Sequence, residues 1–257
     1  VSVAMVLVMV TATALWSSGP PSSRPADAPA DTFYGERAFS HIVKLARESR
    51  QMGSAAQLRA IDYIVSELKA LGIETQPFDE TLHDVRGQLR PIRNIVGRIP
   101  GTTSTKAILL MAHHDSVAAA PGAEDDASGV AAILETARAL KAGPPLRNDV
   151  ILLFTDGEEP GIYGAKLFAE EHPWARNVGL VFNFDGRGSD GPVVVPEITV
   201  ANGWIVTEMA KAAPYLRANS LMRDVQRHMP NDSDLTPFRD AGIAGMNFNF
   251  TGRYPSY

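Results

Sequence analysis

The sequence predicts an α/β fold in which helices cover both faces of a central sheet. Short apolar runs bounded by turn residues alternate with segments of helical spacing, and this alternation is typical of that fold class. Three of the apolar runs, at residues 108–111, 150–154 and 180–184, are followed by acidic or imidazole side chains and a glycine-containing turn. Because ligands of α/β sheets bind where strands end, these three turns are the predicted functional site.

The composition is that of a globular domain. With 257 residues the chain can bury one large core, or one domain with a short appendage. Its 45% hydrophobic and 21% charged residues are ordinary for such a domain. A net charge of −5 without a basic run argues against a nucleic-acid partner. The absence of cysteine excludes disulfide bonds and cysteine-ligated metals.

The N-terminal region differs from the rest of the chain. Residues 1–16 are apolar and uncharged, but a membrane span needs roughly twenty residues, so the segment is short by about one helical turn. Residues 17–32 are rich in Pro, Ser and Ala and are interpreted as a flexible linker. An apolar segment tethered in this way favours a membrane anchor or export signal over a core strand or helix, although no basic residues precede it. We therefore expect one domain, residues 33–257, anchored or exported outside the cytoplasm.

The domain begins with two predicted helices and two strands. Apolar residues recur at helical spacing within 36–50, and a second helix begins after Ser54, a capping residue, and ends at Gly72. Residues 73–78 and 92–99 have strand character, and a Pro-Gly turn closes the second of these strands.

The remaining elements alternate regularly. A Gly-Pro-Pro sequence stops the helix after the first motif strand, and prolines also end the two helices that follow. The predicted strands are 107–111, 150–154, 180–184, 193–195 and 245–250, and the predicted helices are 128–141, 163–171, 203–213 and 235–240.

Imidazole and carboxylate groups at the three strand ends have the chemistry of a metal site. They belong to His113, His114, Asp115, Glu124, Asp125, Asp126, Glu158, Glu159 and Asp185. Adjacent buried carboxylates repel one another unless a cation neutralises them. Nitrogen and oxygen donors together suit zinc, with manganese or cobalt as alternatives. Helix capping is an alternative for Asp126 or Ser128, but it does not explain the two further acidic turns.

Four motifs carry a resemblance to a known family. They are His113-His114-Asp115, residues 122–129, Asp156-Gly157-Glu158-Glu159 and Asn183-Phe184-Asp185. In this order they resemble the di-zinc aminopeptidase family, which includes bacterial leucyl-type aminopeptidases, glutamate carboxypeptidase and glutaminyl cyclase. The resemblance runs from about Phe39 to the end of the chain. Residues 230–234, Phe238 and 241–243 are most similar to the membrane-anchored branch of the vacuole and endoplasmic reticulum.

The resemblance implies a three-layer sandwich, with a mixed, mostly parallel sheet between helix layers, and two zinc ions per complete domain. Two metals about 3.5–4 Å apart need a bridging carboxylate. Spacing alone leaves both Asp125 and Asp126 open as the bridge, and the match of the surrounding motif to the family selects Asp125. By the same carry-over, His113 and Asp185 complete one metal site and Glu159 belongs to the other.

The resemblance also implies two catalytic residues. Glu158 would be the general base, since a carboxylate beside metal-activated water can take its proton and pass it to the leaving amine. Asp115, two residues after His113, would orient that imidazole, and a turn-stabilising role is also compatible with the sequence. The family pattern further implies a cis peptide bond between Asp125 and Asp126.

Three residues are candidates for substrate contacts. Asp232 and Asp234 either face the substrate, for example its ammonium group, or cap the helix that begins at Leu235, and capping is the favoured interpretation. Arg187 follows Asp185 closely and either meets a substrate carboxylate or lies on the surface.

These features predict a zinc-dependent metallo-exopeptidase acting on peptides, an aminopeptidase in the leading interpretation. A glutaminyl cyclase-like enzyme and a non-catalytic peptidase-like ectodomain are the alternatives, and the intact set of ligand types argues against the second. Side-chain specificity depends on pocket shape and is not predicted, and neither is the oligomeric state.

The family's remaining ligand is a histidine late in the chain. Residues 251–257, after the last predicted strand, contain none, and His228 precedes the segment 232–234 and matches no ligand motif. We therefore expect a chain truncated just before its final ligand, which binds one zinc firmly and has little peptidase activity alone.

Overall fold

The central feature of the structure is one mixed sheet. The computed structural model describes residues 2–17, 27–83, 87–103, 106–186, 188–199, 203–213, 218, 221, 224–225, 228 and 232–252. Within them a seven-stranded sheet has the order β1-β2-β4-β3-β5-β7-β6. The strands are β1 (Thr75–His83), β2 (Leu89–Ile99), β3 (Ala107–His113), β4 (Val150–Thr155), β5 (Val178–Gly186), β6 (Asp190–Ile198) and β7 (Ala244–Gly252).

The middle of the sheet is parallel and its two edges are antiparallel. Strands β4, β3, β5 and β7 run parallel to one another. The hairpin of β1 and β2 adds antiparallel to β4, and β6 adds antiparallel to β7. The predicted mixed sheet is confirmed. Because its central strands are parallel, the carboxyl ends of β3, β4 and β5 lie next to one another, at the end of the sheet where these strands finish.

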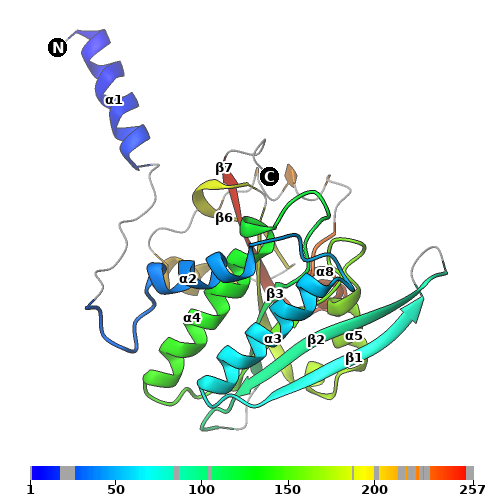
Figure 1. Cartoon of the computed structure of the whole chain (residues 1–257). Coiled ribbons are helices and arrows are strands. Elements are labelled where there is room, and N and C mark those ends of the chain that lie inside the picture. Colours follow the sequence, from blue (N-terminus) through cyan, green and yellow to red (C-terminus); the bar gives the residue numbers. More distant parts are fainter. Residues whose placement is uncertain are drawn as a thin grey trace.

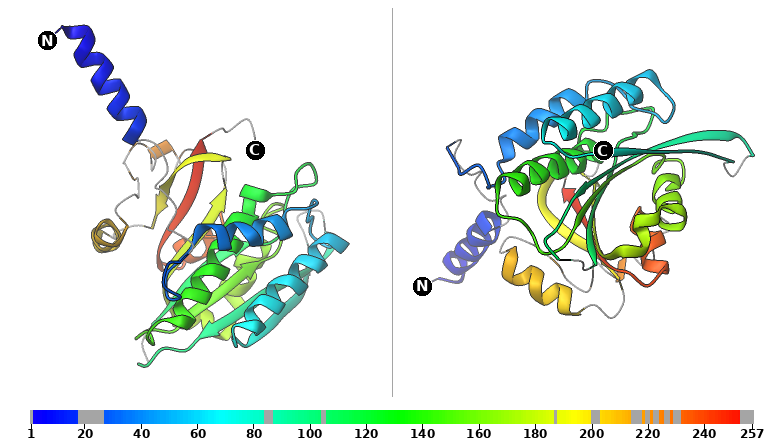
Figure 2. Two further views of the ribbon diagram at one scale, coloured as in Figure 1. Left: turned by 60° about the vertical axis from the view of Figure 1, so that its left-hand side comes forward. Right: turned by 90° about the horizontal axis from the view of Figure 1, so that it is seen from below.

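Helices form a layer on each face of the sheet, as Figure 1 and the right-hand view of Figure 2 show. One layer consists of α2 (Gly35–Leu45), α3 (Ala55–Ala70) and α4 (Ser128–Ala142). The other consists of α5 (Tyr163–Glu171), the short turn η2 (Pro173–Asn177) and α8 (Thr236–Asp240). Helix α6 (Gly203–Ala212) packs against β6 and β7 through Ile205 and Met209. The predicted three-layer sandwich is confirmed.

Strand β4 shows why the sequence predicts a covered sheet. Every one of its residues is buried. Leu152 and Phe154 pack into the core under α3 and α4, whereas Ile151 and Leu153 pack into the core under α5 and α8. A strand buried on both faces has no polar side, so it is a continuous apolar run.

Several element boundaries differ from the prediction. The hairpin strands β1 and β2 are longer than predicted, because the hairpin arm is exposed and therefore lacks the apolar pattern. Helix α2 ends at Leu45 instead of continuing to residue 50. The chain turns there, and this turn carries Arg50 from the helix surface into the interior, where only 1% of it is exposed.

The apolar N-terminal segment is helical. Helix α1 (Val3–Ser17) has exposed apolar side chains, including those of Met5 and Trp16. It stands apart from the other elements in Figure 1 and in the left-hand view of Figure 2. Among the described residues, no helix is both long and apolar enough to cross a membrane. The division into segment, linker and domain remains a prediction.

A buried carboxylate fixes the start of the domain on the helix layer. Glu135 of α4 is 1% exposed and accepts hydrogen bonds from the Tyr34 amide at 2.9 Å and from Arg37 Nε at 3.1 Å. Arg138 Nε donates to its second oxygen at 2.7 Å. Burial alone would raise the pKa of Glu135, but the bonds from Arg138, Tyr34 and Arg37 outweigh burial and lower the pKa below 4.5.

Glu135→Gln should therefore destabilise the domain in a pH-dependent way. A carboxylate whose pKa is lowered by folding stabilises the protein fully above its unfolded-state value, near 4.5, and loses this effect as pH falls through the lower folded value. We expect the variant to lose about 1–3 kcal/mol of unfolding free energy at pH 7, measured by urea denaturation. The difference in unfolding free energy between the variant and the wild type should become smaller below pH 4.5. An equal difference at pH 7 and pH 3 would contradict this. Glu170→Gln, at an exposed site on α5, is the control.

Candidate functional site

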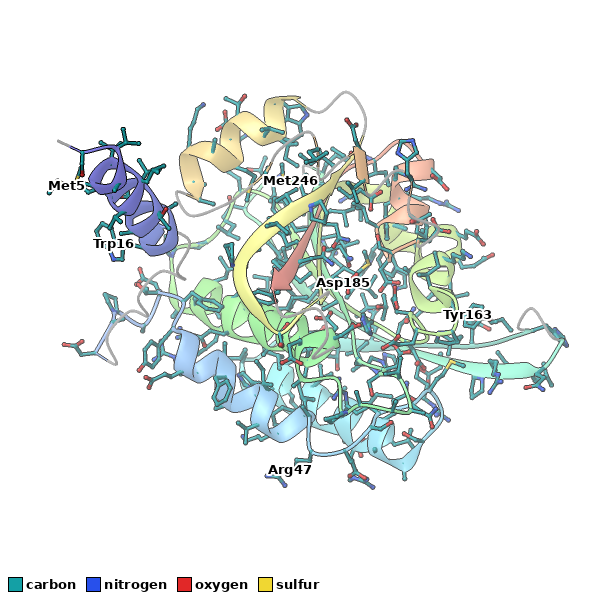
Figure 3. The ribbon with its side chains drawn as sticks, turned by 90° about the horizontal axis from the view of Figure 1, so that it is seen from above. Met5, Trp16, Arg47, Tyr163, Asp185 and Met246 are labelled. Carbon is teal, nitrogen blue, oxygen red and sulfur yellow. The ribbon has the colours of Figure 1, made fainter. Side chains whose placement is uncertain are left out.

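Three of the predicted metal ligands meet at the edge formed by the parallel strand ends. His113 Nε2 at the end of β3 lies 2.7 Å from Asp125 Oδ1 and 4.0 Å from Asp185 Oδ1 at the end of β5. One donor atom from each residue lies within 4.8 Å of the other two, and among the described residues this is the group arranged to hold a metal ion. Asp185 lies near the middle of the molecule in Figure 3.

Asp125 reaches this group from the turn η1 (Ala123–Ala127), where the chain departs from helical angles at Asp125 and Asp126. The peptide bond between these two residues is cis, as the family resemblance implies. The turn also needs a glycine opposite it. A Cβ on Gly186 would lie 2.7 Å from the Glu124 carbonyl oxygen and 3.0 Å from Asp125 Cα, so only glycine lets the turn approach β5 this closely.

Asp126 has a different task from its neighbour. Its Oδ1 accepts a hydrogen bond from the Gly129 amide in the first turn of α4 at 2.9 Å, and its Oδ2 accepts one from the His113 amide at 3.2 Å. Ser128 does not share this task, because its hydroxyl donates to the Glu124 carbonyl. Asp126 thus accepts an amide from the first turn of α4, which is the bond that its capping interpretation predicts, and the geometry leaves Asp125 as the acid that faces Asp185.

Asp115 connects the imidazole to the turn after β4. Its Oδ1 lies 3.4 Å from His113 Nδ1, and its two oxygens accept the amides of Glu158 and Glu159 at 3.2 and 3.4 Å. The orienting and the turn-stabilising geometries are therefore both present in one buried side chain. Burial alone would raise the pKa of Asp115, but contact with His113 lowers it overall.

The acidic side chains around His113 outnumber the positively charged groups that could neutralise them. Burial raises the pKa of Glu158 well above its usual range, with Asp185 and Asp234 adding to the effect. Burial, with Asp125 adding to it, raises the pKa of Glu159 to about 7, although the Glu159 carboxylate accepts the Val117 amide at 3.0 Å. Clustered buried carboxylates of this kind are the donor set that a cation stabilises.

The single imidazole compensates only part of this charge. Burial opposes a charged His113, but Asp125 and Asp115 outweigh burial and raise its pKa well above 6.5. Glu158, Glu159, Asp125 and Asp185 line a cavity of about 360 Å³. One imidazolium therefore faces several carboxylates beside space open to a ligand.

The predicted substrate residues have different locations. Asp232 lines the same cavity. Asp234 is 1% exposed and its carboxylate accepts the Thr155 hydroxyl, while burial raises its pKa to about 7. Arg187 lies outside the described residues.

The favoured capping interpretation is wrong for Asp232 and Asp234. Helix α8 starts after Leu235 and has no side-chain cap hydrogen bond, because the Leu235 backbone is already helical. The Ser233 hydroxyl accepts the Leu235 amide instead, at 3.3 Å. Asp234 is thereby left to point into the interior beside the strand ends.

Sequence reasoning missed Arg50. Its guanidinium donates hydrogen bonds to the carbonyl oxygens of Leu45, His114, Pro121 and Gly122. The Arg50 amide also donates to Ser116 Oγ at 2.9 Å. Most of these partners lie more than sixty residues away along the chain, so local spacing suggested only a helix surface. Arg50 holds the loop between His113 and Asp125 from behind.

Comparison with known families now places the chain. Residues 94–257 match the model of peptidase family M28. The chain belongs to peptidase family M28. A mouse protein named endoplasmic reticulum metallopeptidase 1 is 34% identical over 164 residues, covering 62% of this chain and 18% of that protein. The vacuolar membrane protease of Candida dubliniensis is 29% identical over 222 residues, covering 81% of this chain and 23% of that protein.

The chain thus spans about a fifth of the length of these M28 relatives. Solved structures confirm the fold. A glutaminyl cyclase from an Acidobacteriales bacterium superposes with a TM-score of 0.72 at 20% identity, covering 91% of this chain and 85% of that one. A zinc aminopeptidase from Bacillus subtilis superposes with a TM-score of 0.71 at 16% identity, covering 85% of each.

Arg50→Lys should destabilise this M28 domain although it keeps the charge. One ammonium group cannot replace a planar guanidinium that serves several separate carbonyls, so buried acceptors lose their partners. We expect a loss of about 2–4 kcal/mol in unfolding free energy by urea denaturation. Arg47→Lys is the matched control, because Arg47 is exposed at the rim of the molecule in Figure 3. Equal stabilities of the two variants would refute the role of Arg50.

Proposed function

We propose that this M28 member is a zinc-dependent exopeptidase of the aminopeptidase type, which hydrolyses the N-terminal bond of peptides. The proposal rests mainly on one observation: His113, Asp125 and Asp185 present one nitrogen and two carboxylate donors within 4.8 Å of one another. Nitrogen and oxygen donors in this combination suit zinc. Relatives named metallopeptidase and a neighbour named zinc aminopeptidase support the same chemistry.

The residues present fit zinc. Burial raises the pKa values of Glu158 and Glu159, and neighbouring carboxylates add to the effect, so a bound cation would stabilise both side chains as carboxylates. His113, Asp125 and Asp185 would hold one ion, and Asp125 with Glu159 would contribute to a second. When bound, zinc polarises the scissile carbonyl and lowers the pKa of the attacking water to about 7.

The protein's own groups move the proton. The Glu158 carboxylate takes a proton from the attacking water and delivers it to the nitrogen of the leaving amine. Asp115 supports this step from behind, because it accepts the Glu158 amide and contacts His113 Nδ1. One buried carboxylate thus sets the position of the base relative to the imidazole.

The charge of the cavity favours an N-terminal substrate end. Glu158, Asp185 and Asp232 line it, and among the described residues of its lining the one cation is the exposed Lys166. Carboxylates attract an ammonium group and repel a C-terminal carboxylate. We further propose that the domain works outside the cytoplasm, anchored or exported through residues 1–16. The relatives named for the endoplasmic reticulum and the vacuolar membrane support this location.

The reaction type is tested by comparing two products from the zinc-loaded full-length protein. We expect release of the N-terminal amino acid from unmodified peptides, and no release when the N-terminus is acetylated, because acetylation removes the ammonium charge. Mass spectrometry of a peptide beginning with glutamine reports cyclisation in the same experiment. Cyclisation without release would favour a glutaminyl cyclase. If neither product forms, a non-catalytic domain is favoured.

The two adjacent glutamates are expected to differ in their effects. Glu158→Gln removes the base but not a ligand, so zinc content should stay nearly unchanged while turnover falls roughly 10²–10⁴-fold. Glu159→Gln removes a ligand and should lower zinc content as well as turnover. Zinc retained after dialysis, measured by atomic absorption, separates the two variants. Equal zinc loss in both would refute this division of roles.

A further inference from the structure

A second cavity adjoins the candidate metal site. It has a volume of about 510 Å³ and shares Asp125 and Glu159 with the acidic cavity. The rest of its lining is separate and comes from the loop between the first two motifs: Val117, Ala119, Ala120, Pro121, Gly122, Ala123 and Glu124. Small and apolar side chains therefore surround space that begins at the proposed metal ligands.

The wall of this cavity is held rigidly from its inner side. The Arg50 guanidinium binds the carbonyls of His114, Pro121 and Gly122. The Ser49 hydroxyl donates to the Val117 carbonyl at 3.0 Å, and the Ser116 hydroxyl lies 3.2 Å from the Ala120 carbonyl. Because the loop carbonyls bond toward the protein interior, the loop offers the second cavity mainly methyl and methylene groups.

The wall and the catalytic turn are also connected. The Val117 amide donates to Glu159 Oε1 at 3.0 Å, so the first residue of the wall fixes a proposed metal ligand. A group bound against Ala119 and Ala120 thus lies beside the reacting centre without contacting Glu158, which does not line this cavity.

We infer that the second cavity binds the apolar side chain of the substrate residue on the carboxyl side of the cleaved bond. This inference rests on the proposed function. The two cavities meet at Asp125 and Glu159, where the scissile bond would lie. The acidic cavity suits the ammonium end, so the residue after the bond extends along Val117, Ala119 and Ala120. Small wall residues leave room for a Leu- or Phe-sized side chain, and Glu124 in the lining disfavours an acidic one.

The test uses peptides Leu-Xaa-Gly that differ only at the second residue. Wild-type protein should cleave Xaa = Leu with a kcat/KM about 10- to 100-fold above Xaa = Gly, and should cleave Xaa = Asp worst. Ala119→Trp fills the cavity and should reduce the ratio of kcat/KM for Xaa = Leu to kcat/KM for Xaa = Gly at least about tenfold. Ala118→Trp is the matched control: Ala118 is exposed on the same loop and does not line the cavity.

A binding measurement separates this inference from the proposed function. Calorimetry with zinc-loaded Glu158→Gln protein gives the Kd of Leu-Leu-Gly without turnover. Adding Ala119→Trp should weaken that Kd about tenfold or more, and adding Ala118→Trp should not. Release of leucine with no preference at the second residue would overturn the inference and leave the proposed function intact. Absence of leucine release would overturn the proposed function; with the predicted Kd changes, the second cavity would still be shown to bind the side chain of the second peptide residue. Absence of binding would overturn both.

Discussion

Convergence of several carboxylates on one imidazole is the constraint that organises this M28 domain. Because β3, β4 and β5 are parallel, His113, Glu158 and Asp185 reach one edge of the sheet from three separate parts of the chain. Such a concentration of like charge needs compensation. The protein supplies part of it with His113, whose pKa is raised well above its usual value, and with backbone amides directed at Asp115. Burial, with Asp185 and Asp234 adding to it, still raises the pKa of Glu158, and a bound cation would offset this effect.

The adjacent acids Asp125 and Asp126 have different roles. In the turn η1, Asp125 contacts His113, whereas Asp126 turns toward the amides of Gly129 and His113. The arrangement requires glycine at position 129, since a Cβ on Gly129 would lie 2.5 Å from Asp126 Oδ1. An acid that supports the backbone thus holds in place the neighbouring acid that faces the cavity. Gly129 and Gly186 have no side chain, so the turn η1 can lie this close to α4 and to β5.

The local pattern of apolar and polar residues predicted the strands and helices that carry the site. Contacts between residues distant in sequence determine the features that this pattern did not predict. Strand β4 is a continuous apolar run because both its faces are buried, so its position was readable. Family resemblance distinguished Asp125 from Asp126, which spacing alone did not. The burial of Arg50 was not readable, because its partners His114, Pro121 and Gly122 are distant in sequence. Asp234 was misassigned for the same reason: the hydroxyl that it accepts belongs to Thr155, which is distant in sequence at the end of β4.

The anchoring of the loop before Asp125 separates specificity from catalysis. Neighbours of the same fold include a glutaminyl cyclase and an aminopeptidase at 20% identity or less, so the sheet does not determine the substrate. Arg50 and Ser49 hold the loop through backbone carbonyls, which almost any residue supplies. Side chains at Ala118, Ala119 and Ala120 are therefore free to vary without loss of the contacts that fix the loop. Because the Val117 amide still holds Glu159, the wall beside the reacting centre can change its shape while the acids keep their positions.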